Sequence, residues 1–290
     1  MNFSFDLRFM EVPKKEISLD SIKGYLNSSS AKRIHFATTH SNALKEKNGK
    51  YTISLPFADT IQPLLLSELG WDKGKLFSSK FEDGKFYRII NSDEELKGYQ
   101  DFIRKYQNIV FLRDNLELSI SLDMNFTLED SRSYTEIGEL EYKAKYEKNQ
   151  DAISRLIKLI EKSIKELPFL HWADVVCAMP QKRDSETKLP KIIVNSLDLS
   201  DIQLDNISDK VWLHKKEDLK NCDNLDSKLD VLQESTFEID PDVDLKGKTV
   251  LLVDDLYKSG ASMNFVAMKF KEAGASRVFG LAIVKSLGNS

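Results

Sequence analysis

The chain has 290 residues, of which 41% are hydrophobic and 30% charged, with a formal net charge of −4 at pH 7. This length can bury a sizeable core and is more typical of two domains than of one, while the small net charge indicates neither a nucleic-acid nor a membrane-surface partner. With 2 cysteines and 4 histidines, the chain cannot contain a disulfide framework or a cysteine-rich zinc module.

The first residues, MNFSFDLRFMEV, alternate apolar and polar side chains. This alternation predicts a strand over residues 3–9, because successive side chains of a strand point to opposite faces. The segment lacks the basic start and apolar centre of a secretory leader, and no apolar run is long enough for a membrane span. We therefore expect a cytoplasmic protein.

The following elements predict an α+β unit. Ser92 and Glu95 have the spacing of a capping box, so a helix is expected to begin at residue 93. The run NIVFL at residues 108–112 and the strict alternation over residues 116–126 predict a hairpin. The alternating strand is expected to be half-exposed, since antiparallel sheets commonly have one face in solvent.

The pattern changes after about residue 130. Apolar residues at helical spacing predict an amphipathic helix over residues 150–167, which Pro168 ends. Beyond it, strands are predicted at residues 173–180, 210–214, 248–255 and 277–284, and helices at residues 189–197 and 262–274. Near-continuous apolar strands that alternate with helices indicate a parallel sheet covered on both faces. We therefore expect an N-terminal α+β domain over residues 1–130 and an α/β domain over residues 131–290.

The strand predicted at residues 248–255 ends in two adjacent carboxylates, Asp254 and Asp255. In open α/β sheets, ligands bind beyond the carboxyl ends of the strands. Neighbouring carboxylates there can accept hydrogen bonds from the vicinal hydroxyls of a ribose, or can hold a hydrated magnesium ion. The alternative is a response-regulator-like or generic pair of strand-end aspartates, which is common in α/β proteins.

A short loop follows the aspartates and leads into a helix. It consists of Lys258, Ser259, Gly260, Ala261 and Ser262. Main-chain N–H groups at a helix start, together with serine hydroxyls, suit a phosphate monoester. Glycine allows the backbone to fold closely around such an anion. The carboxylates and the loop together predict a site for ribose 5-phosphate.

The stretch VLLVDDLYKSGAS, residues 250–262, resembles the signature of type I phosphoribosyltransferases. The resemblance implies a Rossmann-like core that binds 5-phosphoribosyl 1-diphosphate (PRPP), with Asp254 and Asp255 at the ribose hydroxyls. It places the 5′-phosphate in the loop over residues 258–262. It also implies Mg²⁺ as cofactor and transfer of the phosphoribosyl group to an acceptor with release of pyrophosphate. No residue is assigned as a direct metal ligand.

The resemblance further implies a pyrophosphate-binding loop after the first core strand. The sequence there is MPQKR, in which Lys182 and Arg183 could neutralise a diphosphate, although a solvated basic turn explains them equally well. Residues 215–247 are long and polar, as functional or mobile loops often are, and related proteins have a flexible closing loop here. Lys215 and Lys216 could reach the diphosphate, but ordinary surface lysines are the simpler interpretation.

A narrower resemblance is to the ComF-like branch of this family. It depends on IGELEYKAKY, MPQKR and STFEI and on the position of the signature close to the end of the sequence. Lys145 and Tyr146 match a motif of that branch, and a solvated helix face is the alternative interpretation. The branch usually carries an N-terminal zinc module, which this chain lacks the cysteines to form.

The acceptor is not identified by these motifs. A nucleobase is the default by analogy, and residues 1–130 are the candidate for recognition of the acceptor or of a protein partner. Residues 131–150 are a candidate interface for a homodimer. The alternative function is a non-catalytic PRPP- or nucleotide-binding regulatory or effector subunit of a bacterial multi-component system. Family members that regulate transcription usually have a DNA-binding helical unit, which is not recognisable here.

Overall fold

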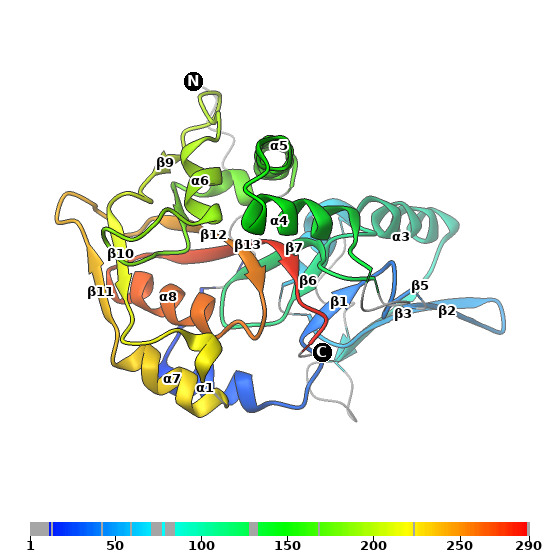
Figure 1. Cartoon of the computed structure of the whole chain (residues 1–290). Helices are drawn as coiled ribbons and strands as arrows, with labels where there is room; N and C mark the ends of the chain where they lie inside the picture. Colours follow the sequence, from blue (N-terminus) through cyan, green and yellow to red (C-terminus); the bar gives the residue numbers. More distant parts are fainter. Residues whose placement is uncertain are drawn as a thin grey trace, which may run out of the picture.

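The computed structural model describes residues 12, 14–41, 43–58, 60–70, 77–78, 85–127, 133–167, 169–222 and 224–288 (Figure 1). In this part of the chain the helices are α1 (Leu19–Asn27), α2 (Gln62–Leu69), α3 (Asp93–Lys105), α4 (Glu136–Tyr146), α5 (Gln150–Glu166), α6 (Leu189–Asn195), α7 (Leu225–Gln233) and α8 (Ala261–Glu272). The strands are β1 (Arg33–His35), β2 (Leu44–Lys47), β3 (Lys50–Leu55), β4 (Phe77–Ser78), β5 (Phe86–Ile90), β6 (Val110–Leu112), β7 (Leu118–Met124), β8 (Val175–Ala178), β9 (Asp205–Asn206), β10 (Val211–His214), β11 (Thr236–Ile239), β12 (Thr249–Tyr257) and β13 (Arg277–Lys285). The strand expected at residues 3–9 lies outside the described residues, as does Pro168.

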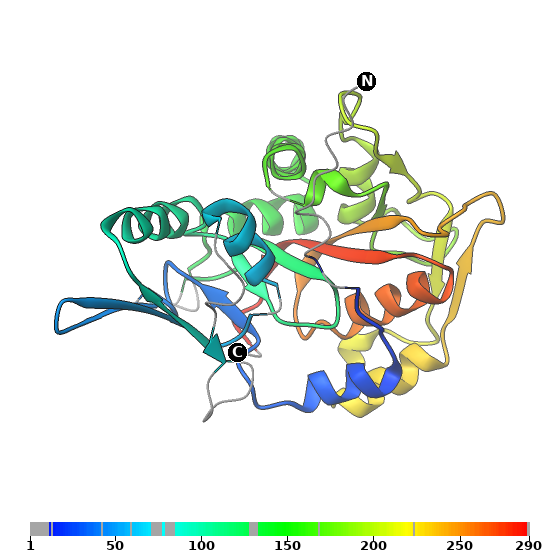
Figure 2. The same ribbon diagram turned by 180° about the vertical axis from the view of Figure 1, so that it is seen from behind.

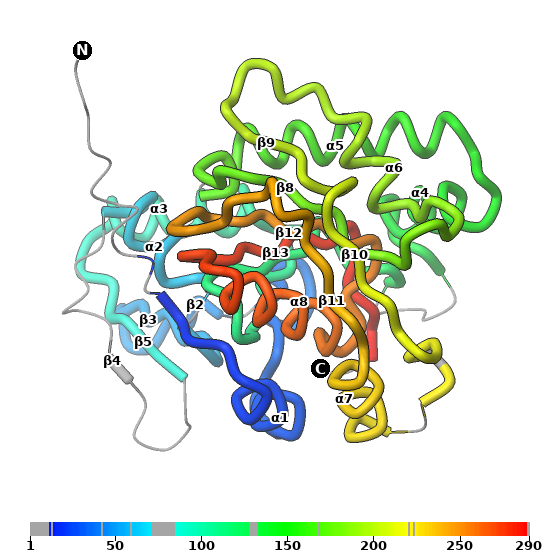
Figure 3. The backbone as a smooth tube through the Cα atoms, turned by 90° about the vertical axis from the view of Figure 1, so that its left-hand side faces the viewer, coloured from blue at the N-terminus to red at the C-terminus, as the bar shows by residue number. Residues whose placement is uncertain are grey.

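Among the described residues, the core is a seven-stranded sheet with the order β1-β6-β7-β13-β12-β8-β9. Strands β7, β13, β12, β8 and β9 are parallel, and β6 and β1 continue the sheet in antiparallel fashion. Helices α4, α5 and α6 lie over one face, and α8 covers the other (Figures 1 and 2). Helices α1 and α7 pack against α8 (Figure 3). The predicted α/β class with a mainly parallel sheet is thereby confirmed.

The sheet contains strands from both sides of residue 130. Strands β1, β6 and β7 precede this residue, and β7 pairs with β13 so that Leu118 lies opposite Phe279. A separate antiparallel sheet, β2-β3-β5-β4, extends to one side of the core (Figure 2). The division into two domains at residue 130 stays a prediction. The central sheet includes strands from both sides of this boundary.

Strand β7 differs from its expected environment, because both of its faces are buried. Ser119 and Ser121 each have 0% exposure, although the alternating pattern predicted a solvated face. Helix α8 covers that face, and the Ser119 hydroxyl lies 3.9 Å from the sulfur of Met263. Small hydroxyl-bearing side chains fit beneath a helix and find partners there, since Ser121 donates to the carbonyl oxygen of Asp123 at 3.0 Å. The predicted hairpin of β6 and β7 is confirmed.

The other helices and strands predicted within the described residues are present. Helix α3 begins after Ser92, whose hydroxyl accepts a hydrogen bond from the Glu95 amide at 3.1 Å. Residues 215–247 depart from the expected loop, since they contain α7 and also β11, which pairs with β10. None of the described helices has the length and apolar character that a membrane crossing requires.

Candidate functional site

A cavity of about 910 Å³ lies beside the carboxyl-terminal part of β12 and between helices α4, α5 and α6. Its charged lining residues are Lys145, Lys148, Glu186, Lys188, Lys215, Asp218, Asp254 and Asp255. Ser262 from the first turn of α8 also lines it. The cavity thus brings both predicted aspartates together with one predicted phosphate-loop residue and with Lys215, which the sequence left ambiguous.

The register of the sheet explains why the two aspartates border this cavity. Strand β8 pairs with β12 only as far as Val253, which lies opposite Ala178. On its other side β12 remains paired with β13 as far as Tyr257, which lies opposite Lys285. The sequence predicted that β12 ends at the aspartates, whereas in the structure β12 continues and its pairing with β8 ends there. Asp254 and Asp255 therefore lie beyond the carboxyl end of β8, where α/β sheets commonly bind ligands.

Asp255 is joined to helix α4 by an ion pair. Its Oδ2 lies 2.9 Å from the Nζ of Lys145, which is also 3.2 Å from the Oε1 of Glu141. Burial disfavours the ammonium ion, but the carboxylates of Asp255 and Glu141 outweigh this effect and raise the pKa of Lys145. Burial also raises the pKa of Glu141, with repulsion from Asp255 acting in the same direction and Lys145 opposing. Lys145 is therefore charged and holds α4 against β12.

Helix α4 approaches the sheet closely because residue 138 is glycine. A Cβ at Gly138 would overlap the carbonyl oxygen of Asn125, at the end of β7. Thr135 caps the helix: its hydroxyl accepts from the Gly138 amide at 2.9 Å and donates to the carbonyl oxygen of Met124 at 2.6 Å. Lys145 then lies two turns beyond Gly138 on the same side of the helix. The glycine and the threonine cap thus set the position of the lysine at the cavity.

Asp254 is the most perturbed carboxylate of the cavity. Burial, followed by repulsion from Asp255, raises the pKa of Asp254 well above its usual range. The Asp255 amide, which donates to Asp254 Oδ1 at 2.9 Å, and the cations Lys145 and Lys215 oppose this shift. Burial lowers the pKa of Lys215, and its neighbour Lys188 acts in the same direction. A carboxyl group with a raised pKa can exchange a proton near neutral pH, and such groups are frequent at functional sites.

The loop between β12 and α8 contains a turn that depends on its glycine. Gly260 has φ of +83°, and a Cβ there would also overlap the hydroxyl of Tyr257. The side chain of Asn264 donates to the Gly260 carbonyl oxygen at 2.8 Å, which holds the loop against α8. Ser262 lines the cavity, whereas Lys258, Ser259, Gly260 and Ala261 lie outside its lining.

The structure does not bring the MPQKR cations to the aspartates. Lys182 and Arg183 are exposed, and neither lines the cavity. The guanidinium of Arg183 lies 3.7 Å from the ring centroid of Trp212 and 3.4 Å from Glu238 Oε2. The cavity instead has Lys145, Lys148 and Lys188, to which the sequence assigned no function. Of these lysines only Lys145 had a sequence signal, as part of the EYKAKY motif.

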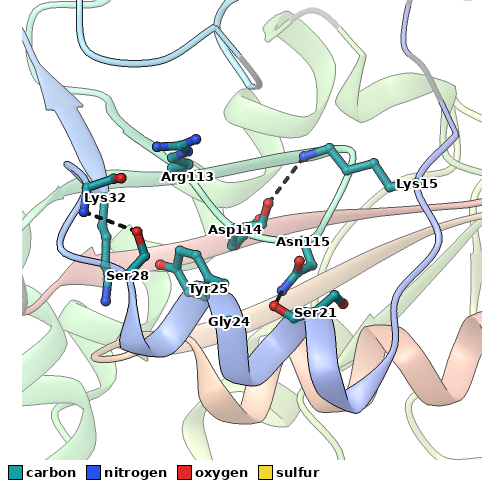
Figure 4. Close-up of a pocket in the computed structure, with 10 residues that line it drawn as sticks. Lys15, Ser21, Gly24, Tyr25, Ser28, Lys32, Arg113, Asp114 and Asn115 are labelled. Atoms are coloured by element: carbon teal, nitrogen blue, oxygen red, sulfur yellow. Dashed lines mark hydrogen bonds between the residues drawn. The ribbon is translucent and has the colours of Figure 1, made fainter. Parts of the chain in front are cut away.

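A second cavity, of about 370 Å³, lies between α1 and the segment that joins β6 to β7 (Figure 4). It is lined by Lys15, Ser21, Gly24, Tyr25, Ser28, Ser30, Lys32, Arg113, Asp114 and Asn115. Asp114 accepts hydrogen bonds from the Tyr257 hydroxyl at 3.1 Å and from the Leu116 amide at 3.0 Å. Burial raises the pKa of Asp114 to about 6. Because the Tyr257 hydroxyl also lies against Gly260, Asp114 helps to set the shape of the loop.

Comparison with known proteins finds similar solved structures but no similar sequences. No family model matches the chain, and no curated protein resembles it in sequence. Similar solved structures include a purine phosphoribosyltransferase from Pyrococcus horikoshii Ot3. The two sequences are 21% identical, and the alignment covers 48% of this chain and 75% of the other, with a TM-score of 0.30. A hypoxanthine phosphoribosyltransferase from Staphylococcus aureus is 10% identical over 47% of this chain and 62% of that chain, also with a TM-score of 0.30. Similarity at this level leaves the function to be argued from the geometry of the site.

Proposed function

We propose that the cavity beside Asp254 and Asp255 binds PRPP with Mg²⁺, and that the chain transfers the phosphoribosyl group to an acceptor. This proposal depends on one observation: Asp254, Asp255 and Ser262 line the same cavity. Carboxylates accept hydrogen bonds from vicinal hydroxyls, and the first turn of a helix binds a phosphate through its N–H groups. Asp254 and Asp255 would bind the ribose hydroxyls, and the loop over residues 258–262 the 5′-phosphate.

The diphosphate of PRPP would meet the positive side of the same cavity. Lys188 and Lys215 line it and would provide positive charge for a diphosphate. Lys145 also lines the cavity, but its charge is paired with Asp255 and Glu141. The described residues contain no cluster of three or more His, Cys, Asp or Glu side chains that would hold a metal ion by itself. Proteins commonly hold Mg²⁺ through one or two carboxylates and the phosphates of the substrate, and Asp254 and Asp255 fit this arrangement. When bound, Mg²⁺ neutralises charge on the leaving diphosphate.

The reaction exchanges one bond at the anomeric carbon of the ribose. The bond from C1 to the diphosphate oxygen breaks with its electron pair on the diphosphate, and a bond from an acceptor nitrogen to C1 forms. Positive charge develops on the sugar in the transition state, and the neighbouring carboxylates stabilise it. The acceptor nitrogen then loses a proton to water or to a nearby base, which balances the reaction.

Calorimetric titration of PRPP and MgCl₂ into the purified chain tests the binding step, and release of pyrophosphate with a panel of nucleobases tests the transfer. We expect PRPP to bind the wild-type chain and to lose its affinity for the double variant Asp254→Asn, Asp255→Asn. Circular dichroism would verify that the variant is folded. A folded double variant with the affinity of the wild type would contradict the site assignment.

A second candidate function is a PRPP- or nucleotide-binding regulatory or effector subunit without catalysis. The placement of Lys182 and Arg183 outside the cavity favours it, because the sequence predicted these residues as the cations for the leaving group. Binding of PRPP without pyrophosphate release, whichever acceptor is supplied, would support this function over transfer.

Four finer expectations belong to the same proposal. The relation to the ComF-like branch depends on the EYKAKY and MPQKR motifs. A cytoplasmic location is expected, because PRPP would be supplied there. Residues 1–130 are expected to recognise the acceptor or a protein partner. Residues 131–150 are expected to form the interface of a homodimer.

A further inference from the structure

The cavity between α1 and the segment that joins β6 to β7 has no ligand in the proposed function. Its volume is about 370 Å³, and cavities of this size hold small ligands. Figure 4 shows that α1 lies on one side of it and residues 113–115 on the other, with Lys15 reaching in from the chain before α1. Lys32, which follows α1, lines the cavity as well. The lining thus comes from parts of the chain that meet only in the folded structure.

Positive side chains dominate this lining. Its cations are Lys15, Lys32 and Arg113, and Asp114 is the one acid among the described lining residues. The charge of Lys15 opposes the rise in the pKa of Asp114, so the two side chains offset one another in part. The lining also contains hydroxyl groups, which belong to Ser21, Tyr25, Ser28 and Ser30. Cations and hydroxyls around one cavity favour an anionic ligand.

Lys32 and its neighbours donate to main-chain carbonyl oxygens. The Nζ of Lys32 donates to the Leu26 carbonyl oxygen at 2.9 Å, and Arg33 donates to that of Leu287 at 3.0 Å. Lys285 donates to two further carbonyl oxygens. Burial, followed by repulsion from Arg33 and Lys32, lowers the pKa of Lys285 to about 7. A carbonyl oxygen has only a partial charge, so an anion beside Lys32 would relieve the positive potential of this region.

The placement of the cations favours a phosphate group over a carboxylate. Lys15 precedes α1, Lys32 follows it, and Arg113 belongs to the opposite side of the cavity. A phosphate group has three terminal oxygens and about two negative charges, so it can bind donors from several sides at once. A planar carboxylate has two oxygens and a single charge.

The walls of the cavity are bonded to the loop between β12 and α8. Asp114 accepts from the Tyr257 hydroxyl at 3.1 Å, and this hydroxyl lies against Gly260. The Asn115 amide donates to Oδ1 of Asn264 at 2.9 Å, and the side chain of Asn264 donates to the Gly260 carbonyl oxygen at 2.8 Å. A ligand that fixes these walls therefore also fixes the contacts that hold the loop.

We propose that this cavity is a second anion site, which binds a small phosphorylated compound and stabilises the loop between β12 and α8. Its lining shares no residue with that of the cavity beside Asp254 and Asp255. The effect on PRPP rests on the proposed function, whereas binding of the anion does not. Each ligand should strengthen the binding of the other, because coupling between two sites is reciprocal.

The probe is inorganic phosphate, titrated calorimetrically into the full-length chain. The variants are Lys32→Gln, which removes the charge and keeps a hydrogen-bond donor, Lys32→Arg, which keeps the charge, and Arg113→Gln. The matched control is Lys23→Gln, because Lys23 is on α1, outside the cavity lining, with its Nζ 3.4 Å from Asp226. Circular dichroism and thermal unfolding verify that each protein is folded, and Arg113→Gln decides if Lys32→Gln is not.

Lys32→Gln and Arg113→Gln should each weaken phosphate binding by about tenfold, since each removes one charge-assisted contact. Lys32→Arg and Lys23→Gln should bind phosphate as the wild type does, and acetate should bind more weakly than phosphate. Phosphate should tighten the binding of PRPP with MgCl₂ to the wild type by about fivefold. At the same phosphate concentration Lys32→Gln should show no such gain, and without phosphate its PRPP affinity should equal that of the wild type.

The inference is overturned if folded Lys32→Gln binds phosphate as tightly as the wild type. It is also overturned if Lys215→Met loses phosphate binding in its place, since the anion then occupies the cavity beside Asp254 and Asp255. Acetate binding as tight as that of phosphate would exclude the proposed ligand class. PRPP binding that phosphate leaves unchanged or weakens would exclude the proposed effect on the loop.

Failure of the proposed function gives a different result. The wild type would then bind no PRPP, whether phosphate is present or absent. The phosphate titrations of the wild type and Lys32→Gln would still decide whether the second anion site exists.

Discussion

Lys145 on α4 and Asp255 on β12 form the ion pair that closes one side of the candidate site, with 2.9 Å between Nζ and Oδ2. The two side chains are largely shielded from solvent, with exposures of 28% for Lys145 and 15% for Asp255. The pair has a double effect. It holds α4 against the sheet, and it compensates the charge of an acidic pair that would otherwise be repelled by Glu141.

Replacing Lys145 tests this tether. Lys145→Met leaves Asp255 and Glu141 without their shared cation, and we expect the free energy of unfolding to fall by about 2 kcal/mol, less than for a fully buried pair. The matched control is Lys143→Met on the same helix, whose partner Glu139 lies at the surface. Urea denaturation should show a clear loss for the first variant and almost none for the second. Equal losses would show that the ion pair with Asp255 has no special contribution.

Two glycines in helices should respond to alanine with opposite signs. Gly138→Ala places a methyl group against the carbonyl oxygen of Asn125, and moving α4 to relieve the overlap should destabilise the chain by about 2 kcal/mol. Gly24→Ala in α1 has no atom within 4 Å of the added Cβ, and should stabilise by about 0.5 to 1 kcal/mol through helix propensity. Thermal unfolding of both variants checks the prediction, which fails if Gly138→Ala melts at or above the wild-type temperature.

Stability should depend on pH through Asp114. Burial raises the pKa of Asp114 to about 6 from an ordinary value of 3.8, so the folded chain binds this proton more tightly than the unfolded chain. The stability that this group contributes is complete below about pH 4 and is lost as the pH rises through about 6, with a total on the order of 3 kcal/mol. Asp114→Asn removes the titration, so the variant should gain stability relative to the wild type as pH rises. Urea denaturation at about pH 4 and about pH 7 measures this difference; a difference that does not change with pH would contradict the assignment.

Adjacent lysines after β10 should differ in their effect on PRPP binding. Lys215 lines the cavity, whereas Lys216 forms a surface ion pair with Glu234 at 2.7 Å. Lys215→Met should weaken PRPP binding by about tenfold, since a cation beside a phosphate contributes a charge-assisted interaction. Lys216→Met should leave the affinity unchanged, and calorimetric titration compares the two. The reverse order would exclude Lys215 from the phosphate site, and a loss with Arg183→Met would support the pyrophosphate loop predicted from the sequence.

The sequence anticipated those features that depend on residues close together in the chain. The Ser92–Glu95 cap, the helical spacing within residues 150–166 and the apolar runs of β8, β12 and β13 all reflect contacts within a few residues or a simple repeat. The adjacent aspartates and the glycine turn after them belong to this group, since one short segment contains both.

The sequence did not correctly predict the features that depend on contacts between segments far apart in the chain. The exposed face expected for β7 is buried because α8 covers it, and no pattern within residues 116–126 signals that cover. Arg183 lies on Trp212 because the pairing of β10 and β11 brings Trp212 and Glu238 together, and this keeps it away from the cavity. The cations of the cavity come instead from α4, from the segment between α4 and α5, from the start of α6 and from the segment after β10.

Local spacing alone was enough to predict the strand that carries Asp254 and Asp255, the turn at Gly260 and the helix after it, because short-range sterics and hydrogen bonds determine such elements. Which residues contact those carboxylates is determined by the tertiary structure. Lys145 reaches Asp255 only because Gly138 lets α4 rest on the end of β7, and β7 lies there only because it pairs with β13. Such contacts join parts of the chain that have no common sequence pattern, and packing of the whole core selects them.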